Sequence, residues 1–137
     1  MIYNIVGGCE DPETAMRRAG ALVGAAGPIA ADMPFWQFKA GMALAAYLHA
    51  AALLDRDMNT VKVWCSGHAA TRCAECIRLG CDCGDYCHGD GEAVEALATD
   101  PRASRALLST LGEIQAPGQT TASIRLTMTQ ILRRAAL

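Results

Sequence analysis

Six of the seven cysteines in this sequence fall within the 23 residues 65–87, and two closely spaced pairs stand out among them. Cys73 and Cys76 form a Cys-x-x-Cys pair, and we select Cys83 and Cys87 as the second pair. Two such pairs supply the four thiolates of a tetrahedral zinc site, with Zn–S distances of about 2.3 Å. The spacing therefore predicts one structural zinc ion held by these four residues.

The cysteine-rich segment, residues 65–91, is rich in glycine and aspartate and poor in apolar side chains. A metal ion would supply folding free energy that such a segment cannot obtain by burying apolar surface. Four more residues could each replace one of the ligands, namely Cys65, His68, Cys81 and His88. Two other interpretations stay open. The cysteines could be reduced thiols or air-formed disulfides, or they could form an iron–sulfur or redox site, although their spacing matches no common cluster motif.

No other motif in the sequence indicates catalysis. There is no glycine-rich phosphate loop ending in Lys-Ser/Thr, no His-Glu-x-x-His and no Gly-x-Ser-x-Gly. The carboxylates are scattered, and the histidines are dispersed at His49, His68 and His88, so a catalytic dyad would have to be assembled by the fold. We therefore expect no catalytic residues, and a reactive cysteine is the one weak argument for an enzyme.

The composition indicates a single helical domain. A chain of 137 residues has room for one hydrophobic core, and 52% of its residues are apolar while only 5% are aromatic. Alanine is abundant, which favours helices packed closely through small side chains. With a net charge of −2, the chain has no general electrostatic attraction to nucleic acid or to an anionic membrane.

The location and membrane behaviour can also be judged from the sequence. The N-terminus lacks the basic and long apolar regions of a signal peptide, which favours the cytoplasm, where cysteines stay reduced or bind metal. Residues 35–54 have the length of a membrane span, but Gln37, Lys39 and His49 interrupt them. We expect a buried central helix there.

Helix start and stop signals divide the chain into elements. Asp11-Pro12-Glu13 combines an N-cap, a proline at the first helical position and an acid in the first turn, and Asp100-Pro101 repeats the cap and the proline. The fold class is therefore all-α, a compact bundle of five to seven helices with a short extended segment at residues 2–6. The expected helices span residues 12 to about 26, 34 to about 55, 59 to about 64, 100 to about 111, and from Thr120 or Thr121 to near the C-terminus.

The apolar pattern predicts which side chains are buried. The first helix has a stripe of Ala15, Ala19, Leu22 and Ala26, and the last has one of Ile124, Met128, Ile131 and Ala135. The central helix, residues 34–55, is apolar on both sides, and we assign its aromatic start to the core. We expect Cys9 to be a packing residue, His49 to be a satisfied histidine in the core or at its rim, and Arg125 to point away from the last stripe.

Parts of the chain resemble a known family, the TraG-like coupling proteins of actinobacterial conjugative type IV secretion. The matching residues are Gly8-Cys9-Glu10-Asp11-Pro12-Glu13, Ala15, Arg17-Arg18-Ala19, Leu22-Val23, Phe35-Trp36 and the stretch from Leu44 to Leu54, with a looser match in the last helix. Members of that family are membrane-anchored hexameric ATPases whose nucleotide-binding domain carries an inserted all-α domain. The resemblance implies that residues 1–137 are this insert, with residues 1–8 as a remnant of the junction.

The resemblance also implies a role, because the inserted domain lies at the cytoplasmic mouth of the motor and contacts transfer substrates, relaxosome proteins or DNA. It implies neither zinc nor particular binding residues. We therefore expect a non-catalytic substrate-docking domain, and the alternative is a free-standing zinc-stabilised helical adaptor or regulator. The pairs Arg17-Arg18 and Arg133-Arg134 would form a local basic patch if the first and last helices packed side by side.

Overall fold

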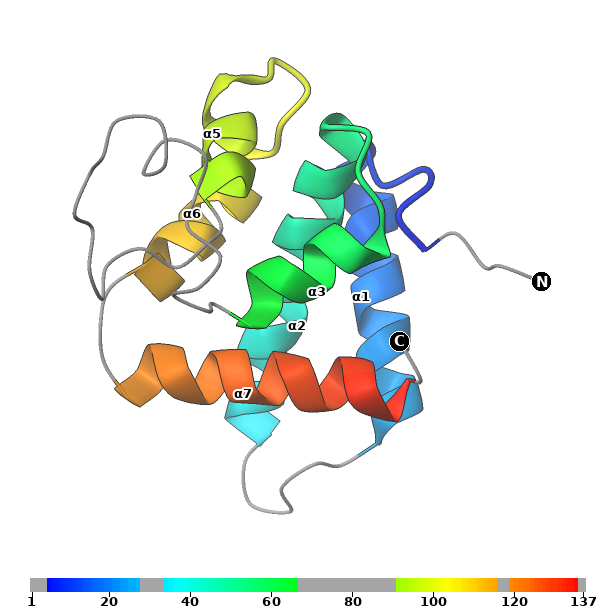
Figure 1. Ribbon diagram of the computed structural model, residues 1–137, viewed down its shortest axis with the longest axis vertical. Helices are drawn as coiled ribbons and strands as arrows, with labels where there is room; N and C mark the ends of the chain where they lie inside the picture. Colours follow the sequence, from blue (N-terminus) through cyan, green and yellow to red (C-terminus); the bar gives the residue numbers. More distant parts are fainter. Residues whose placement is uncertain (1–4, 28–33, 67–90, 116–118, 136–137) are drawn as a thin grey trace.

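The computed structural model describes residues 5–27, 34–66, 91–115 and 119–135, and within these ranges the chain is all-α, as the sequence predicts. Helix α2 lies in the middle and contacts the five other helices (Figure 1). The elements in chain order are α1 (Pro12–Ala26), α2 (Pro34–Leu53), α3 (Met58–Ser66), α5 (Gly91–Thr99), α6 (Arg105–Gln115) and α7 (Gln119–Arg134).

Helix α2 is the core of the bundle. Every residue from Ala43 to Ala52 is buried, and no Asp, Glu, Lys or Arg interrupts the sequence between Lys39 and Asp55. Most of these buried residues are alanines, whose small side chains let neighbouring helices approach closely. The interpretation of this segment as a central core helix is confirmed. Among the described helices, none combines the length and apolar character needed to cross a membrane.

Helix α1 begins and ends as its sequence predicts. The Asp11 carboxylate accepts hydrogen bonds from the backbone N–H and the hydroxyl of Thr14 at 3.3 and 2.9 Å, which satisfies the open end of the helix. The helix ends at Gly27, whose φ of 70° is readily adopted by glycine. The predicted stripe of Ala15, Ala19, Leu22 and Ala26 is buried.

The predicted start of α6 at Asp100-Pro101 is wrong. The Asp100 carboxylate accepts a hydrogen bond from the backbone N–H of Arg102 at 2.8 Å, which forms a turn between α5 and α6. Ser104 is the N-cap instead, because its hydroxyl accepts from the Leu107 N–H at 3.3 Å. Aspartate and serine are both suitable N-cap residues, but only the Ser104 side chain accepts a hydrogen bond from a backbone N–H of α6.

Two predictions for α7 are also wrong. The helix begins at Gln119, so Thr120 and Thr121 lie inside its first turn and are not its N-cap. Arg125 is buried, and its Nη1 donates a hydrogen bond to the Trp64 carbonyl at 2.8 Å. The reason is tertiary, since α7 packs against α3 and the guanidinium binds the carbonyl end of that helix. The stripe of Ile124, Met128 and Ile131 is buried as predicted.

The described part of the N-terminal segment, residues 5–9, consists of bends and turns and not of the strand considered for residues 2–6. Ile5 and Val6 are nevertheless buried and belong to the core of the bundle. Arg18 holds the segment in place by donating hydrogen bonds to the carbonyls of Ile5, at 2.7 Å, and of Gly7. The segment is therefore an integral part of the domain.

Candidate functional site

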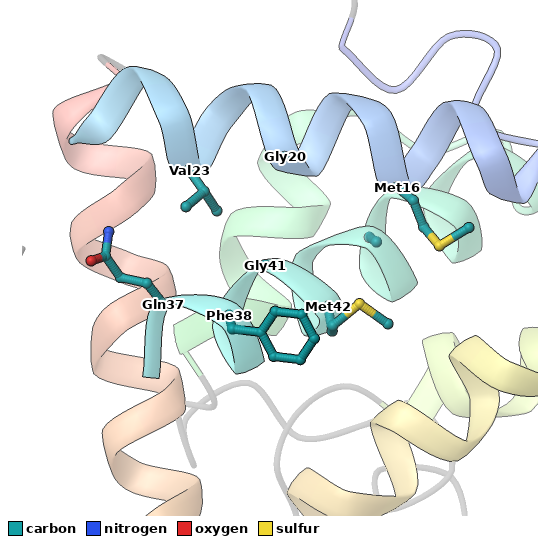
Figure 2. Close-up of a pocket in the computed structure, with 8 residues that line it drawn as sticks. Met16, Gly20, Val23, Gln37, Phe38, Gly41 and Met42 are labelled. Atoms are coloured by element: carbon teal, nitrogen blue, oxygen red, sulfur yellow. The ribbon is translucent and has the colours of Figure 1, made fainter. Parts of the chain in front are cut away.

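A groove with a volume of about 220 Å³ lies between α1 and the first half of α2 (Figure 2). Figure 2 shows Val23 and Met16 extending from α1 toward α2, and Phe38 and Met42 extending from α2 beside them. Gln37 supplies the polar side chain of the lining, and it donates a hydrogen bond to the Gly27 carbonyl at 2.9 Å. The lining residues are Met16, Gly20, Val23, Gln37, Phe38, Gly41, Met42 and Ala45.

Large apolar side chains are exposed at this groove. In the lining, the exposed fraction is 65% for Phe38 and 42% for Met16, and Phe35, which lies outside the lining near the start of α2, is 55% exposed. The assignment of the aromatic start of α2 to the core is therefore wrong for both phenylalanines, whereas Trp36 is partly buried. Contiguous exposed apolar surface on a soluble domain is typical of a binding site for another macromolecule.

A second hollow, of about 150 Å³, lies on the other side of Phe38 and Met42, against α6 and α7. Its rim carries an ion pair, in which Lys39 Nζ lies 3.2 Å from a carboxylate oxygen of Glu113. The same Lys39 nitrogen lies 5.8 Å from the centre of the Phe35 ring. Phe38 and Met42 thus form an apolar ridge with a hollow on each side.

The glycines of α1 and α2 differ in the space that is available for a side chain. A Cβ at Gly41 would lie 3.2 Å from Cγ2 of Val23, so the close approach of α1 and α2 favours glycine there. A Cβ at Gly20 or Gly24 would meet nothing within 4 Å. Because glycine inside a helix costs about 1 kcal/mol relative to alanine, packing within the chain does not explain these two residues. Gly20 belongs to the lining of the groove, whereas Gly24 does not.

The predicted zinc ligands Cys73, Cys76, Cys83 and Cys87 lie outside the described residues, as do the substitutes His68, Cys81 and His88. The remaining substitute, Cys65, is buried in α3. Within the described ranges, no three His, Cys, Asp or Glu side chains gather as metal ligands would. The zinc site stays a prediction.

The joint basic patch of the two arginine pairs stays a prediction. Helices α1 and α7 do pack together, as that hypothesis required. However, Arg18 binds main-chain carbonyls of residues 5–9, and Arg134 Nη1 donates to the Ala26 carbonyl at 3.2 Å. One guanidinium of each pair thus donates a hydrogen bond to a main-chain carbonyl of the domain.

Two groups with shifted pKa values lie away from the groove. Burial raises the pKa of the Cys9 thiol, and this effect exceeds the opposing effect of Arg18. Hydrogen bonds from Arg102 lower the pKa of Asp100. None of the described residues that line the groove is a nucleophile, an acid or a base.

Comparison with known proteins gives no relative, since no family model, curated protein or solved structure matches the chain. The resemblance to TraG-like coupling proteins therefore stays a prediction. The groove was not predicted from the sequence, because every apolar residue of α2 was assigned to the core. A usable signal was present, since Gln37 and Lys39 flank Phe38 and show that the first turns of α2 reach solvent.

Proposed function

We propose that this chain is a substrate-docking domain of a type IV secretion coupling protein, which binds a secreted or relaxosome protein and is not catalytic by itself. The observation that carries the proposal is the groove between α1 and α2, with Phe38 largely exposed at its edge. Aromatic side chains beside apolar hollows are the residues that contribute most to protein–protein binding. The resemblance described above supplies the biological setting.

The charge of the domain favours a protein over DNA as the partner. Tight binding to DNA requires a concentrated basic face that neutralises phosphates. The chain has a net charge of −2, and Arg18, Arg125 and Arg134 donate to main-chain carbonyls. Apolar contacts to a protein therefore dominate, and DNA binding is an outcome that the experiment below can detect.

The shape of the groove favours an amphipathic helix as the bound segment. The groove runs between two helices, and in the described part of the chain no strand offers an edge for main-chain pairing. A helix would place its apolar residues at spacings of i, i+3, i+4 and i+7 against the ridge of Phe38 and Met42. Charged residues beside these apolar ones would meet the Lys39–Glu113 pair on the rim of the second hollow.

In this proposal the chain works in the cytoplasm as part of a larger hexameric ATPase anchored at the inner face of the plasma membrane. The parent protein hydrolyses ATP, and this domain selects what is transferred. Binding and hydrolysis are therefore separable activities. A variant that loses docking keeps the ATPase activity of the parent.

The experiment compares two glutamate substitutions in the parent protein. Phe38→Glu places a charge at the groove, and Leu126→Glu places the same charge on α7 at a side chain of similar exposure, 60%. The proposal predicts that Phe38→Glu abolishes substrate transfer while ATP hydrolysis persists, and that Leu126→Glu transfers normally. Normal transfer by Phe38→Glu would refute the docking role of the groove. If binding assays on the same variants show that Phe38→Glu loses binding to DNA but keeps binding to the substrate protein, the groove is assigned to DNA.

The spacing of the cysteines favours a second candidate function, a free-standing zinc-stabilised adaptor or regulator. Such a protein would use the same groove for a partner outside secretion. The flanking genomic sequence separates the two candidates. A phosphate-binding loop upstream and an acidic Walker B strand downstream in one open reading frame would establish the coupling protein, and their absence from that frame would favour the adaptor.

A further inference from the structure

The imidazole of His49 is completely buried and connects three separate parts of the chain. Its Nδ1 lies 2.8 Å from the carbonyl oxygen of Cys9, and its Nε2 lies 3.1 Å from the backbone nitrogen of Ser104. A carbonyl can only accept and a backbone N–H can only donate. His49 is therefore in the neutral form that carries its proton on Nδ1 and accepts a hydrogen bond at Nε2.

The hydrogen bond from the Ser104 N–H to His49 replaces one that a capping box makes within its own helix. In a capping box, the N-cap residue's own N–H is satisfied by a Glu or Gln three residues later. Ser104 is the N-cap of α6, but the residue three positions later is Leu107, which is buried in the core. Nε2 of His49, on α2, takes the place of that side chain.

We propose that His49 is an acid-sensitive latch that holds the first turn of α6 and the segment 5–9 against α2. Protonation of the ring would place a second N–H at Nε2, opposite the N–H of Ser104, and would remove the acceptor that completes the cap. The first turn of α6 would then open. Imidazole is the ordinary side chain type that gains a proton in mildly acidic solution.

The charged groups near the ring include Asp100, whose carboxylate interacts electrostatically with His49. Asp100 and Arg102 lie in the α5–α6 turn and are paired with each other at 3.0 Å. On the other side, Arg18 reaches within 4.0 Å of the Cys9 sulfur, and Glu10 follows Cys9 in the chain. Because Arg102 lowers the pKa of Asp100, that carboxylate stays ionised at pH 5, where the latch is tested.

The test measures hydrogen-exchange protection of the Ser104, Leu107 and Leu108 amides at pH 7.5 and pH 5.0, with intrinsic exchange rates accounted for. The full chain is compared with His49→Gln, whose amide oxygen can accept from Ser104 at either pH. We expect protection to fall about tenfold at the lower pH in the wild type, the equivalent of one lost hydrogen bond, and less than about twofold in His49→Gln. Equal falls in both proteins would refute the latch.

A second measurement needs no substitution at His49 and keeps the test decisive if His49→Gln does not fold. Nitrogen-15 NMR of the ring should show a proton on Nδ1 and none on Nε2 at pH 7.5, and the Ser104 amide should shift together with ring protonation. Ser104→Ala keeps the N–H but lacks the hydroxyl cap, so it should retain the same coupling. A proton on Nε2 at pH 7.5, or a Ser104 amide that does not follow the ring, would overturn the proposal.

Discussion

Gly41 of α2 lies directly against Val23 of α1, since a Cβ on Gly41 would stand 3.2 Å from Cγ2 of that valine. The branched side chain of Val23 has little rotamer freedom in a helix, so it cannot easily move away. We expect Gly41→Ala to destabilise the domain by about 1 kcal/mol despite the higher helix propensity of alanine. Gly20→Ala should stabilise it by about 0.5–1 kcal/mol, because its Cβ meets nothing.

Urea denaturation of both glycine variants measures this difference. The two substitutions are chemically identical and lie on facing helices of the same groove. Equal stabilisation by both would show that α1 and α2 are not in close contact at Gly41. A loss of stability in Gly20→Ala would show that its surroundings are filled.

Substitutions of Asp55 and Asp57, which follow the C-terminus of α2, should change the stability of the domain in different directions. Asp55 has a φ of 57°, and the Arg56 and Asp55 N–H groups donate to the carbonyls of Ala51 and Ala52, which is a Schellman motif. Glycine adopts this conformation without a steric penalty, so Asp55→Gly should stabilise the domain by about 0.5–1 kcal/mol.

Asp57 is the matched control for that substitution. Its carboxylate accepts from the Thr60 N–H at 3.3 Å and caps the start of α3. Asp57→Gly or Asp57→Ala should therefore be neutral or destabilising, by up to about 1 kcal/mol for alanine. Thermal unfolding of the three variants checks the signs, and stabilisation by Asp57→Ala would contradict the assignment of the cap.

These examples show which parts of the fold the sequence predicts. Local signals worked where a side chain could act only on its own helix, as at Asp11, whose carboxylate caps α1. They failed at Asp100, which binds the nearby Arg102 N–H instead, and at Arg125, whose partner Trp64 is 61 residues away. At Asp100 a competing local turn decides the outcome, whereas at Arg125 tertiary packing decides it, and no local pattern contains that packing.

The candidate site was less predictable than the fold for a physical reason. Apolar periodicity distinguishes the faces of a helix only when one face is polar, and α2 is apolar on both sides. Exposure of Phe38 depends on whether another helix covers it. His49 was correctly interpreted as a satisfied core residue, but its partners at positions 9 and 104 are brought together only by the fold.

Cys9 should react slowly with thiol reagents in the native protein. It is fully buried, donates to the Ile5 carbonyl at 3.2 Å, and has a raised pKa because burial disfavours the thiolate. We expect native-state alkylation by iodoacetamide at pH 8 to be at least about tenfold slower than in urea, followed by mass spectrometry of the Cys9 peptide. Equal rates would show that the residue is accessible.

The raised pKa of Cys9 also determines how the stability of the domain changes with pH. A thiol with a raised folded-state pKa contributes stability that is complete below the unfolded-state pKa, near 9.0, and is lost as pH rises through the folded-state value. The wild type should therefore lose more stability between pH 8 and pH 10.5 than Cys9→Ala does. Parallel curves for the two proteins would contradict this sign.

The zinc prediction can be tested separately from the groove. Protein purified without chelator under reducing conditions should contain about one zinc per chain, and Cys76→Ser should lower this content. Cys65→Ser should keep the metal and instead lower stability, because Cys65 is buried in α3. Less than about a tenth of an equivalent of zinc in the wild type would leave thiols or disulfides as the explanation of the cysteines.

The central claim is that the groove between α1 and α2 binds a protein, and filling the groove tests it most directly. Gly20→Leu adds a side chain inside the groove, whereas Gly24→Leu adds the same side chain on the same helix outside its lining, and both positions have open space. Calorimetric titration with a purified transfer-substrate protein should give equal affinity for the wild type and Gly24→Leu and at least about tenfold weaker binding for Gly20→Leu, a loss of about 1.4 kcal/mol. Unchanged affinity in a folded Gly20→Leu, or no binding by the wild type, would contradict the claim.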